Sequence, residues 1–373
     1  MALKFHKIQI PLCHSQGILF SSSECLPDQL SLIRIWLHEA DRVYQDKLVY
    51  EEDIKTYEKI VSEQVKKGFD DLQSDESTIL AQPNIFSHFA FGMGDPKYMP
   101  IADFDTLTRI LTDALASYNE FNSIMNLVLF EDAMNYVVRI SRILESPRGN
   151  ALLVGVGGSG KQSLARLAAY MSSLDVFQIA LRKGYSAQEL KTDLSTLYVK
   201  AGQKNIGTVF LMTDAQVAEE TYLVLINDML ASGEIPEILP DDEVENIISS
   251  MRTEVKTVGL EDTRDNCWKY FIDRVRRQLK VVLCFSPVGS TLRNRSRKFP
   301  AITNCTQIIW FHEWPEEALM SVSQIFVREI EAVPGHLREG VAAFMAYVHA
   351  SVNEMSRAYL ANEKRHNYTT PKR

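Results

Sequence analysis

The sequence predicts an α/β fold in which a five-stranded parallel sheet is sandwiched between helices, with smaller helical units on either side in the chain. Three observations support this prediction. A glycine-rich turn joins an apolar run to a helix, segments with helical spacing separate the apolar runs, and the runs are apolar throughout. Uninterrupted apolar runs are typical of parallel strands buried on both faces. The five runs lie at 151–155, 175–181, 208–213, 281–286 and 306–311.

The segment before the sheet is predicted to be mainly helical. Residues 26–49 carry apolar side chains at helical spacing, with Pro27 near the start, and a charged helical stretch covers 51–71. His38 and Glu39 are expected to be a solvated pair on the first of these helices.

A polar, turn-rich run at 73–84 predicts a boundary between units. Residues 83–101 combine Pro, Gly and aromatic side chains, which favours an ordered loop. Two further helical patterns, 103–120 and 130–144, precede the sheet and end at a Pro- and Gly-containing breaker.

Within the sheet region, the helices that follow the first two strands are expected at 162–174 and 187–201, and a long acidic, partly helical insertion follows the third strand. After Trp314-Pro315 the pattern is wholly helical, with one apolar seam formed by Val341, Phe344, Met345, Val348, Val352, Met355 and Tyr359. The sequence therefore predicts three units, covering residues 1–74, 75–313 and 314–373.

Composition narrows the class of protein. Of 373 residues, 46% are hydrophobic and 24% charged, and the net charge of −8 argues against nucleic-acid binding, which usually needs a basic face. Five dispersed cysteines without a CxxC pair favour reduced thiols over disulfides or a zinc site. No apolar run approaches the roughly 20 residues that span a bilayer. A soluble intracellular protein with no membrane partner is expected.

The glycine-rich turn matches a phosphate-binding loop, since Gly155-x4-Gly160-Lys161 follows a strand and opens a helix. Its glycines allow backbone N–H groups to converge, the helix N-terminus adds a positive field, and Lys161 is expected to reach the β- and γ-phosphates of a nucleotide. The alternative is a glycine-rich turn at a sheet edge. The candidate phosphate-binding residues are Gly155, Val156, Gly157, Gly158, Ser159, Gly160, Lys161, Gln162 and Ser163.

The loop departs from its usual pattern where a hydroxyl side chain would bind Mg²⁺, because Gln162 stands there. Thr213 and Asp214, which end the third strand, are the candidates for the acidic pair that holds metal and orients water. Thr213 takes the place of the metal-binding Asp, and Asp214 is one methylene shorter than the usual Glu. We expect weakened metal binding at Gln162, Thr213 and Asp214, and poor hydrolysis; alternatively, Asp214 only caps the next helix.

Segments 152–170, 175–185, 222–252 and 281–319 together resemble the fourth AAA+ module of an axonemal dynein heavy chain, with the outer-arm type nearest. The resemblance runs from about Gly17 to the C-terminus and implies an AAA+ P-loop NTPase fold. Residues 18–49 resemble the end of the preceding, third module, in which Arg42 matches a sensor arginine.

The resemblance also implies further site residues. Asn126, Leu127, Val128 and Leu129 match a loop that packs on adenine, although core packing explains the leucines nearly as well, and Ser286 matches a polar sensor of the γ-phosphate. One arginine among Arg293, Arg295 and Arg297 would reach the nucleotide of the preceding module as an arginine finger, with Arg295 favoured and Arg297 second. Each of the three could equally be a solvated helix charge.

The family implies a regulatory module that binds ATP or ADP, with Mg²⁺ weakened, inside a minus-end-directed microtubule motor of the ciliary axoneme. Its implied partners are neighbouring AAA+ modules, dynein intermediate and light chains, and microtubules, in the cytoplasm and cytoskeleton. The microtubule-binding stalk of the family would follow the last residues of this sequence. Two alternatives stay open: a competent ATPase that uses Asp214, and a structural ring segment that binds no nucleotide.

Overall fold

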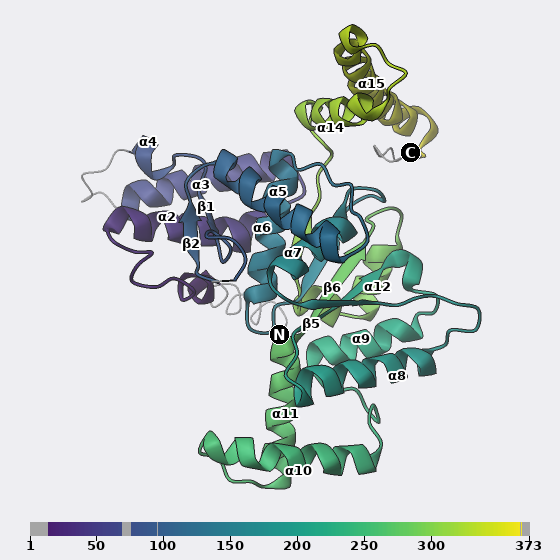
Figure 1. Ribbon diagram of the computed structural model, residues 1–373. Coiled ribbons are helices and arrows are strands. Elements are labelled where there is room, and N and C mark those ends of the chain that lie inside the picture. Colours follow the sequence, from purple (N-terminus) through teal and green to yellow (C-terminus); the bar gives the residue numbers. More distant parts are fainter. Residues whose placement is uncertain (1–13, 69–75, 95, 366, 368–373) are drawn as a thin grey trace.

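The structure, a computed structural model, describes residues 14–68, 76–94, 96–365 and 367 and has a parallel sheet at its centre (Figure 1). The sheet has five strands in the order β4-β5-β6-β3-β7, and every neighbouring pair is parallel. The predicted strands and fold class are confirmed. Their bounds are β3 Ala151–Val154, β4 Asp175–Gln178, β5 Thr208–Thr213, β6 Leu279–Phe285 and β7 Gln307–Trp310.

The strand order places the glycine-rich loop and the third predicted strand at the same edge of the sheet. β6 lies between β3 and β5, with Cys284 in register with Leu153 on one side and Thr213 on the other. Because all strands are parallel, the segments that follow β3, β5 and β6 leave the sheet together. The chemistry expected after Val154 and Thr213 is therefore brought to one place.

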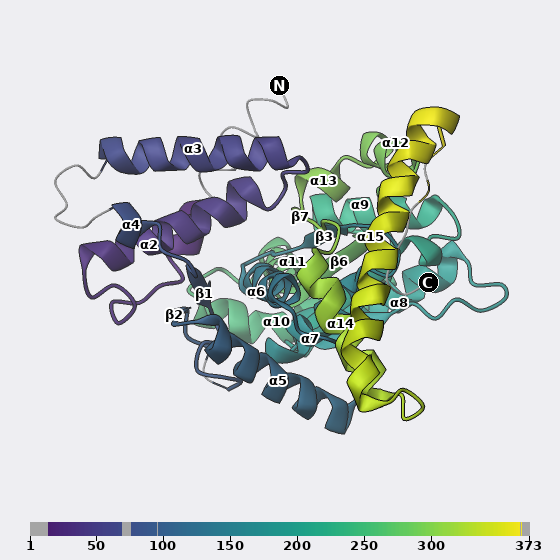
Figure 2. The same cartoon turned by 90° about the horizontal axis from the view of Figure 1, so that it is seen from above.

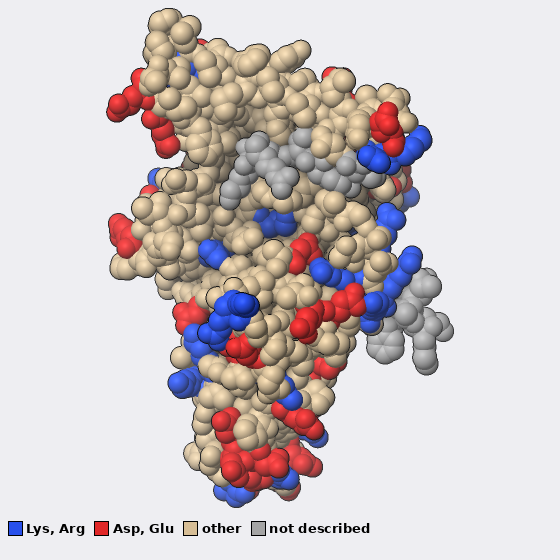
Figure 3. Space-filling model, turned by 90° about the vertical axis from the view of Figure 1, so that its right-hand side faces the viewer, with Lys and Arg blue, Asp and Glu red and all other residues tan. Residues whose placement is uncertain are grey.

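Helices cover both faces of the sheet, as uninterrupted apolar strands require. One face, which includes Leu153 and Leu211, packs against α5 (Phe104–Phe121), α6 (Glu131–Glu145) and α7 (Lys161–Met171). The other, which includes Leu152 and Met212, packs against α8 (Ala187–Tyr198), α9 (Thr221–Ala231), α10 (Asp241–Thr257) and α11 (Arg264–Gln278). The acidic insertion thus forms helices α9 to α11. Acidic side chains gather at the end of the molecule to which α10 contributes (Figure 3).

The N-terminal helices form their own small cluster beside the sheet (Figures 1 and 2). α2 (Gln29–Ala40) continues into a π-helical turn, η1 (Asp41–Gln45), and α3 (Glu51–Gly68) and α4 (Glu76–Ile79) follow. Ile33 and Leu37 of α2 pack against Val65 of α3. The helix predicted over 26–49 is shorter than expected, and the boundary predicted at 73–84 lies partly outside the described residues.

The loop predicted at 83–101 is wrong in part, because it contains an antiparallel hairpin of β1 (Ile85–Ser87) and β2 (Met99–Ile101). Strands of three residues are too short to show a period of two in the sequence. The hairpin joins two clusters. Phe86 packs with Ile35 of α2, while Ile85 packs with the helices over the sheet.

A buried ion pair connects the N-terminal helices to the main unit. The Glu39 carboxylate accepts hydrogen bonds from Arg142 Nε at 2.9 and 3.1 Å, from Arg142 Nη2 and from the Tyr98 hydroxyl. His38, whose Nδ1 lies 2.9 Å from the Asn84 carbonyl oxygen, is also buried. The solvated pair expected at His38 and Glu39 is therefore wrong, since α2 turns this face toward α6 and the hairpin.

The last helices stand away from the sheet (Figure 1). α14 (Glu316–Glu329) and α15 (Arg338–Glu363) pack on each other around Ala342 and Ala346. The predicted helix is present, but the apolar seam is largely exposed: Phe344 and Met355 are 64% and 68% exposed. The division of the chain at residues 74 and 313 stays a prediction.

Candidate functional site

The loop between β3 and α7 has the backbone geometry of a phosphate-binding loop. Gly158 and Gly160 both have φ of 85°, a conformation that favours glycine. A Cβ on Gly155 would lie 2.7 Å from Phe311 Cβ, while one on Gly157 would meet open space. The loop is thus anchored at its first glycine against Phe311, which directly follows β7, and exposed at its tip, and α7 begins directly after the loop.

Lys161 is folded back over this loop. Its Nζ donates to the carbonyl oxygens of Gly155 (2.6 Å) and Val156 (2.7 Å) and to Ser159 Oγ (3.0 Å). Burial lowers the pKa of the ammonium, while the nearby Cys284 and Asp214 raise it and oppose that effect. The lysine charge therefore lies inside the loop, where it can meet a phosphate anion.

Asp214 follows β5 and uses both of its carboxylate oxygens within the protein. Oδ1 accepts from Arg295 Nη1 at 2.6 Å, and Oδ2 accepts from the backbone N–H of Ser286. Arg295 comes from α12 (Thr291–Lys298), and its guanidinium carbon lies 5.4 Å from the centre of the Phe285 ring. The side chain of Arg295 is 11% exposed and that of Asp214 35%, so the guanidinium is shielded from water while the carboxylate is partly accessible.

Three glutamine side chains occupy the neighbouring part of this edge. Gln178, at the end of β4, donates from Nε2 to Gln162 Oε1 (3.4 Å) and to Gln216 Oε1 (3.2 Å). Gln216 Oε1 also accepts from the backbone N–H (2.9 Å) and the hydroxyl (3.1 Å) of Thr213. We call Gln162, Gln178 and Gln216 the glutamine chain. Arg166 of α7 donates to Gln178 Oε1 and holds the chain against the helix.

The donor set at this edge does not fit Mg²⁺, which needs free oxygen ligands in near-octahedral geometry. The carboxamide oxygen of Gln162 and both oxygens of Asp214 accept protein hydrogen bonds, and the hydroxyl of Thr213 donates one to Gln216. Within the described part of the chain, no group of three or more His, Cys, Asp or Glu residues is placed to hold a metal ion. The metal role predicted for Gln162, Thr213 and Asp214 is therefore not supported by their contacts.

The loop between β3 and α7 offers groups that suit a nucleotide phosphate, in contrast to the side chains after β5, which do not suit a metal ion. The exposed tip at Gly157 and Gly158 leaves backbone N–H groups accessible, and the N-terminus of α7 and Lys161 supply positive charge. Gln162 is exposed at this end and Ser163 half-buried. The predicted adenine loop lies between α5 and α6: Leu127 and Leu129 are half-buried against the core, Val128 is half-buried, and Asn126 is exposed.

The arginines do not lie as expected. Arg295, favoured as the finger for the preceding module, faces Asp214 of its own module, whereas Arg293 and Arg297 are exposed on α12. The position of Arg295 on α12 turns it toward the end of β5 in this structure, and the finger role expected for it stays a prediction. Arg42 pairs with Asp46 at 3.0 Å.

The Ser286 hydroxyl accepts a hydrogen bond from the backbone N–H of Val288 at 3.4 Å, so Ser286 contacts Asp214 through its backbone rather than its side chain.

Sequence reasoning missed Arg166, Gln178 and Gln216. A polar residue such as Gln178, placed where an apolar strand ends, is the signal that could have found the glutamine chain. The pairing of Arg295 with Asp214 had no local signal, since 81 residues separate them.

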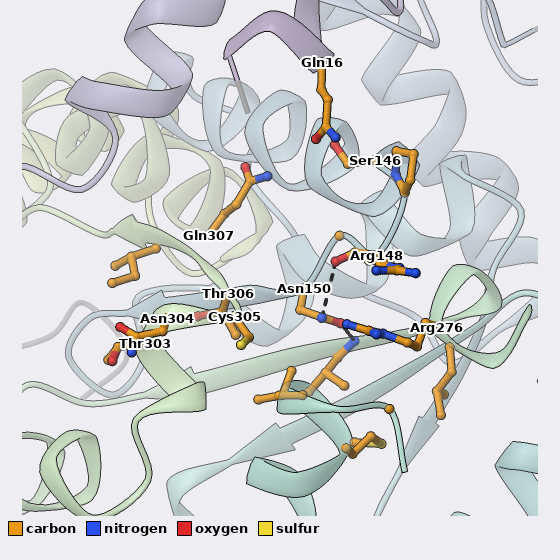
Figure 4. A pocket seen from close by; sticks show the side chains of 18 of the residues that line it. Gln16, Ser146, Arg148, Asn150, Arg276, Thr303, Asn304, Cys305, Thr306 and Gln307 are labelled. Carbon is orange, nitrogen blue, oxygen red and sulfur yellow. Dashed lines mark hydrogen bonds between the residues drawn. The ribbon is translucent and has the colours of Figure 1, made fainter. Parts of the chain in front are cut away.

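A large cavity lies elsewhere, at the opposite edge of the sheet (Figure 4). It measures about 720 Å³ and is bounded by the starts of β3, β6 and β7 and by the N-terminal helices. Arg148 and Arg276 lie near Asn150, and Gln307 lines another side. Arg42 also lines it, but none of the phosphate-loop residues does. Cavity size therefore does not identify the candidate site, and loop geometry does.

Comparison with known families agrees with the fold and with the loop. Residues 125–373 match the family described as "P-loop containing dynein motor region D4", and residues 1–79 match the "AAA+ lid domain". The first match covers most of the chain, including the sheet, the phosphate loop and Asp214. The chain belongs to the dynein heavy chain family. The AAA+ fold and the fourth-module resemblance predicted from the sequence are confirmed.

Several axonemal dyneins are similar to this chain over 96% of its length. The "Dynein beta chain, ciliary" of Heliocidaris crassispina is 65% identical over 357 residues, and "Dynein axonemal heavy chain 17" of Homo sapiens is 63% identical. The "Dynein beta chain, flagellar outer arm" of Chlamydomonas reinhardtii is 43% identical over 362 residues. The outer-arm type fits these relatives, of whose length the chain spans about 8%. Among the described helices, none combines the length and apolar character needed to cross a membrane.

Proposed function

We propose that this chain is a nucleotide-binding regulatory module of an axonemal dynein heavy chain that holds ATP or ADP and hydrolyses it slowly or not at all. The observation that carries the proposal is the loop itself. Gly155, Gly158 and Gly160 set its backbone, and Lys161 Nζ lies within 3.0 Å of three of its oxygens. Lys161 is already buried inside the loop. A phosphate that bound there could accept the hydrogen bonds that the lysine now gives to the loop oxygens, and no further positive charge would have to be buried.

Slow hydrolysis follows from what Asp214 contacts. Orienting a water molecule for attack requires a carboxylate that can accept the hydrogen bond of that water. Both oxygens of Asp214 already accept bonds, from Arg295 and from the Ser286 N–H. This supports the regulatory role over the alternative of a competent ATPase that uses Asp214. The structured loop in turn supports both over a ring segment that binds nothing.

In the larger protein, the bound nucleotide would set how the helical unit of α14 and α15 packs against the sheet and thereby bias neighbouring modules. We propose three units, at 1–74, 75–313 and 314–373, with the first belonging to the preceding module. We also propose, from the names of the relatives, a place in the cytoskeleton of the ciliary axoneme, in a minus-end-directed microtubule motor with intermediate and light chains. The exposed Arg297 is the better placed candidate finger toward the preceding module.

Thermal unfolding with added nucleotide, together with a turnover assay, tests the proposal. ATP or ADP at 100 times Kd should stabilise the chain by about 2.7 kcal/mol, while phosphate release stays at background. Lys161→Ala should abolish the stabilisation. Lys183→Ala, which removes an exposed lysine from another loop, should leave it unchanged. Equal stabilisation of the Lys161→Ala chain, or rapid turnover by the unmodified chain, would contradict the proposal.

A further inference from the structure

The charges at the carboxyl edge of the sheet raise a specific difficulty for a bound nucleotide. A triphosphate carries several negative charges, and Asp214 adds a carboxylate close to the loop that would hold them. The strand register shows this proximity. Cys284 of β6 pairs with Leu153 of β3 on one side and with Thr213 of β5 on the other, so the phosphate loop and Asp214 leave the sheet on either side of β6. P-loop NTPases resolve such repulsion with a divalent cation between carboxylate and phosphates.

In this module a guanidinium already pairs with that carboxylate. Arg295 Nη1 donates to Asp214 Oδ1 at 2.6 Å, and the side chain of Arg295 is largely buried in this pair. The Phe285 ring supports the guanidinium at 5.4 Å, and the Ser286 N–H fixes the second carboxylate oxygen. The pair is therefore held from three sides. Of the other positions expected to bind metal, Gln162 belongs to the glutamine chain and Thr213 donates a hydrogen bond to it.

We propose that Arg295 takes the place of the divalent cation, so that this module binds its nucleotide without Mg²⁺. This inference rests on the proposed nucleotide binding and names the ligand as the metal-free nucleotide. Arg295 neutralises Asp214, and a guanidinium has five N–H donors, so that pairing through Nη1 leaves others for phosphate oxygens. A guanidinium suits this role because its planar fork can serve a carboxylate and a phosphate at once through different N–H groups.

Nucleotide titrations with and without metal test the proposal. ATP is titrated into the unmodified chain by calorimetry, once in EDTA and once in Mg²⁺, and the two Kd values should agree within about threefold. Arg295→Ala should weaken binding in EDTA by about tenfold or more, which corresponds to about 1.4 kcal/mol. Mg²⁺ should restore much of this loss, because the variant leaves Asp214 free to bind the ion. Arg293→Ala, which removes an exposed arginine from the same helix, should match the unmodified chain in both buffers.

Asp214→Asn gives an independent measurement if Arg295→Ala does not fold. It removes the repulsive charge, so binding in EDTA should be at least as tight as in the unmodified chain. The proposal is overturned if the unmodified chain needs Mg²⁺ by tenfold or more, if Arg295→Ala behaves like Arg293→Ala, or if Asp214→Asn loses a metal-dependent part of the affinity. In those cases Lys161→Ala still abolishes binding, and only the metal-free role fails. A chain that binds nucleotide in neither buffer overturns the proposed function as well.

Discussion

Replacing Glu39 with Ala should destabilise the chain strongly, because it leaves a buried guanidinium without its carboxylate. Glu39 is fully buried, and the side chain of Arg142 is 2% exposed. After the change, Arg142 would keep a hydrogen bond from Nη1 to Gln307 Oε1 at 3.1 Å. Burial alone lowers the pKa of Arg142, but Glu39 more than offsets this and raises it above its ordinary value. Breaking a buried pair by removing one partner costs about 3–5 kcal/mol.

That cost corresponds to a fall in Tm of about 6–20 °C, since 1 kcal/mol shifts Tm by about 2–4 °C in a unit of this size. Differential scanning calorimetry of three variants measures it. Glu52→Ala removes an exposed carboxylate from α3 and should change the free energy of unfolding by about 0.5 kcal/mol at most. Glu39→Met with Arg142→Met should recover most of the loss, because neither charge then stays buried alone. A Tm for Glu39→Ala equal to that of Glu52→Ala would refute the reasoning.

Three further changes have expected outcomes. Gly202→Ala should lower the free energy of unfolding by about 1–3 kcal/mol in urea denaturation, because the new Cβ would lie 2.6 Å from Val275 Cγ2. An unchanged free energy of unfolding would show that α11 can move to make room for the methyl group. Burial, with help from Arg142, lowers the pKa of His88 to about 4, so the folded state binds fewer protons and loses stability as pH falls from about 6.5 toward 4. His88→Gln should reduce this loss, at most about 3 kcal/mol, and equal losses in both chains would contradict it. Gln162→Thr with Thr213→Asp should make Mg²⁺ tighten ATP binding in calorimetric titration, and an unchanged Kd would show that these positions do not limit metal binding.

The parts of the fold that local patterns encode could be predicted from the sequence. The five strands are uninterrupted apolar runs, and a parallel sheet necessarily brings the segments after β3 and β5 to one edge, which is where Lys161 and Asp214 lie. The fourth-module resemblance rested on segments 152–170, 175–185, 222–252 and 281–319. The hairpin of β1 and β2 escaped prediction because three-residue strands leave no detectable alternation.

Contacts between distant segments account for most of the remainder. The sequence predicts Glu39 to be solvated on its helix, because its partner Arg142 lies 103 positions away. Only the folded chain shows that both side chains are buried. In the sequence, Arg295 is one of three arginines on a basic helix. Their spacing does not show that α12 directs this side chain toward Asp214. The apolar seam of α15 has the spacing of a core-facing helix, but the seam is exposed in the structure. Periodicity reveals an apolar face and does not show whether another element covers it.

The most direct test of the account is an equilibrium titration of ATP into the purified chain beside its Lys161→Ala variant, with circular dichroism to show that both are folded. We expect binding in the micromolar range that the variant lacks, since the lysine charge lies inside the loop at Gly155, Val156 and Ser159. A folded, unmodified chain that takes up no ATP would contradict the account and leave the module as a structural segment of the ring.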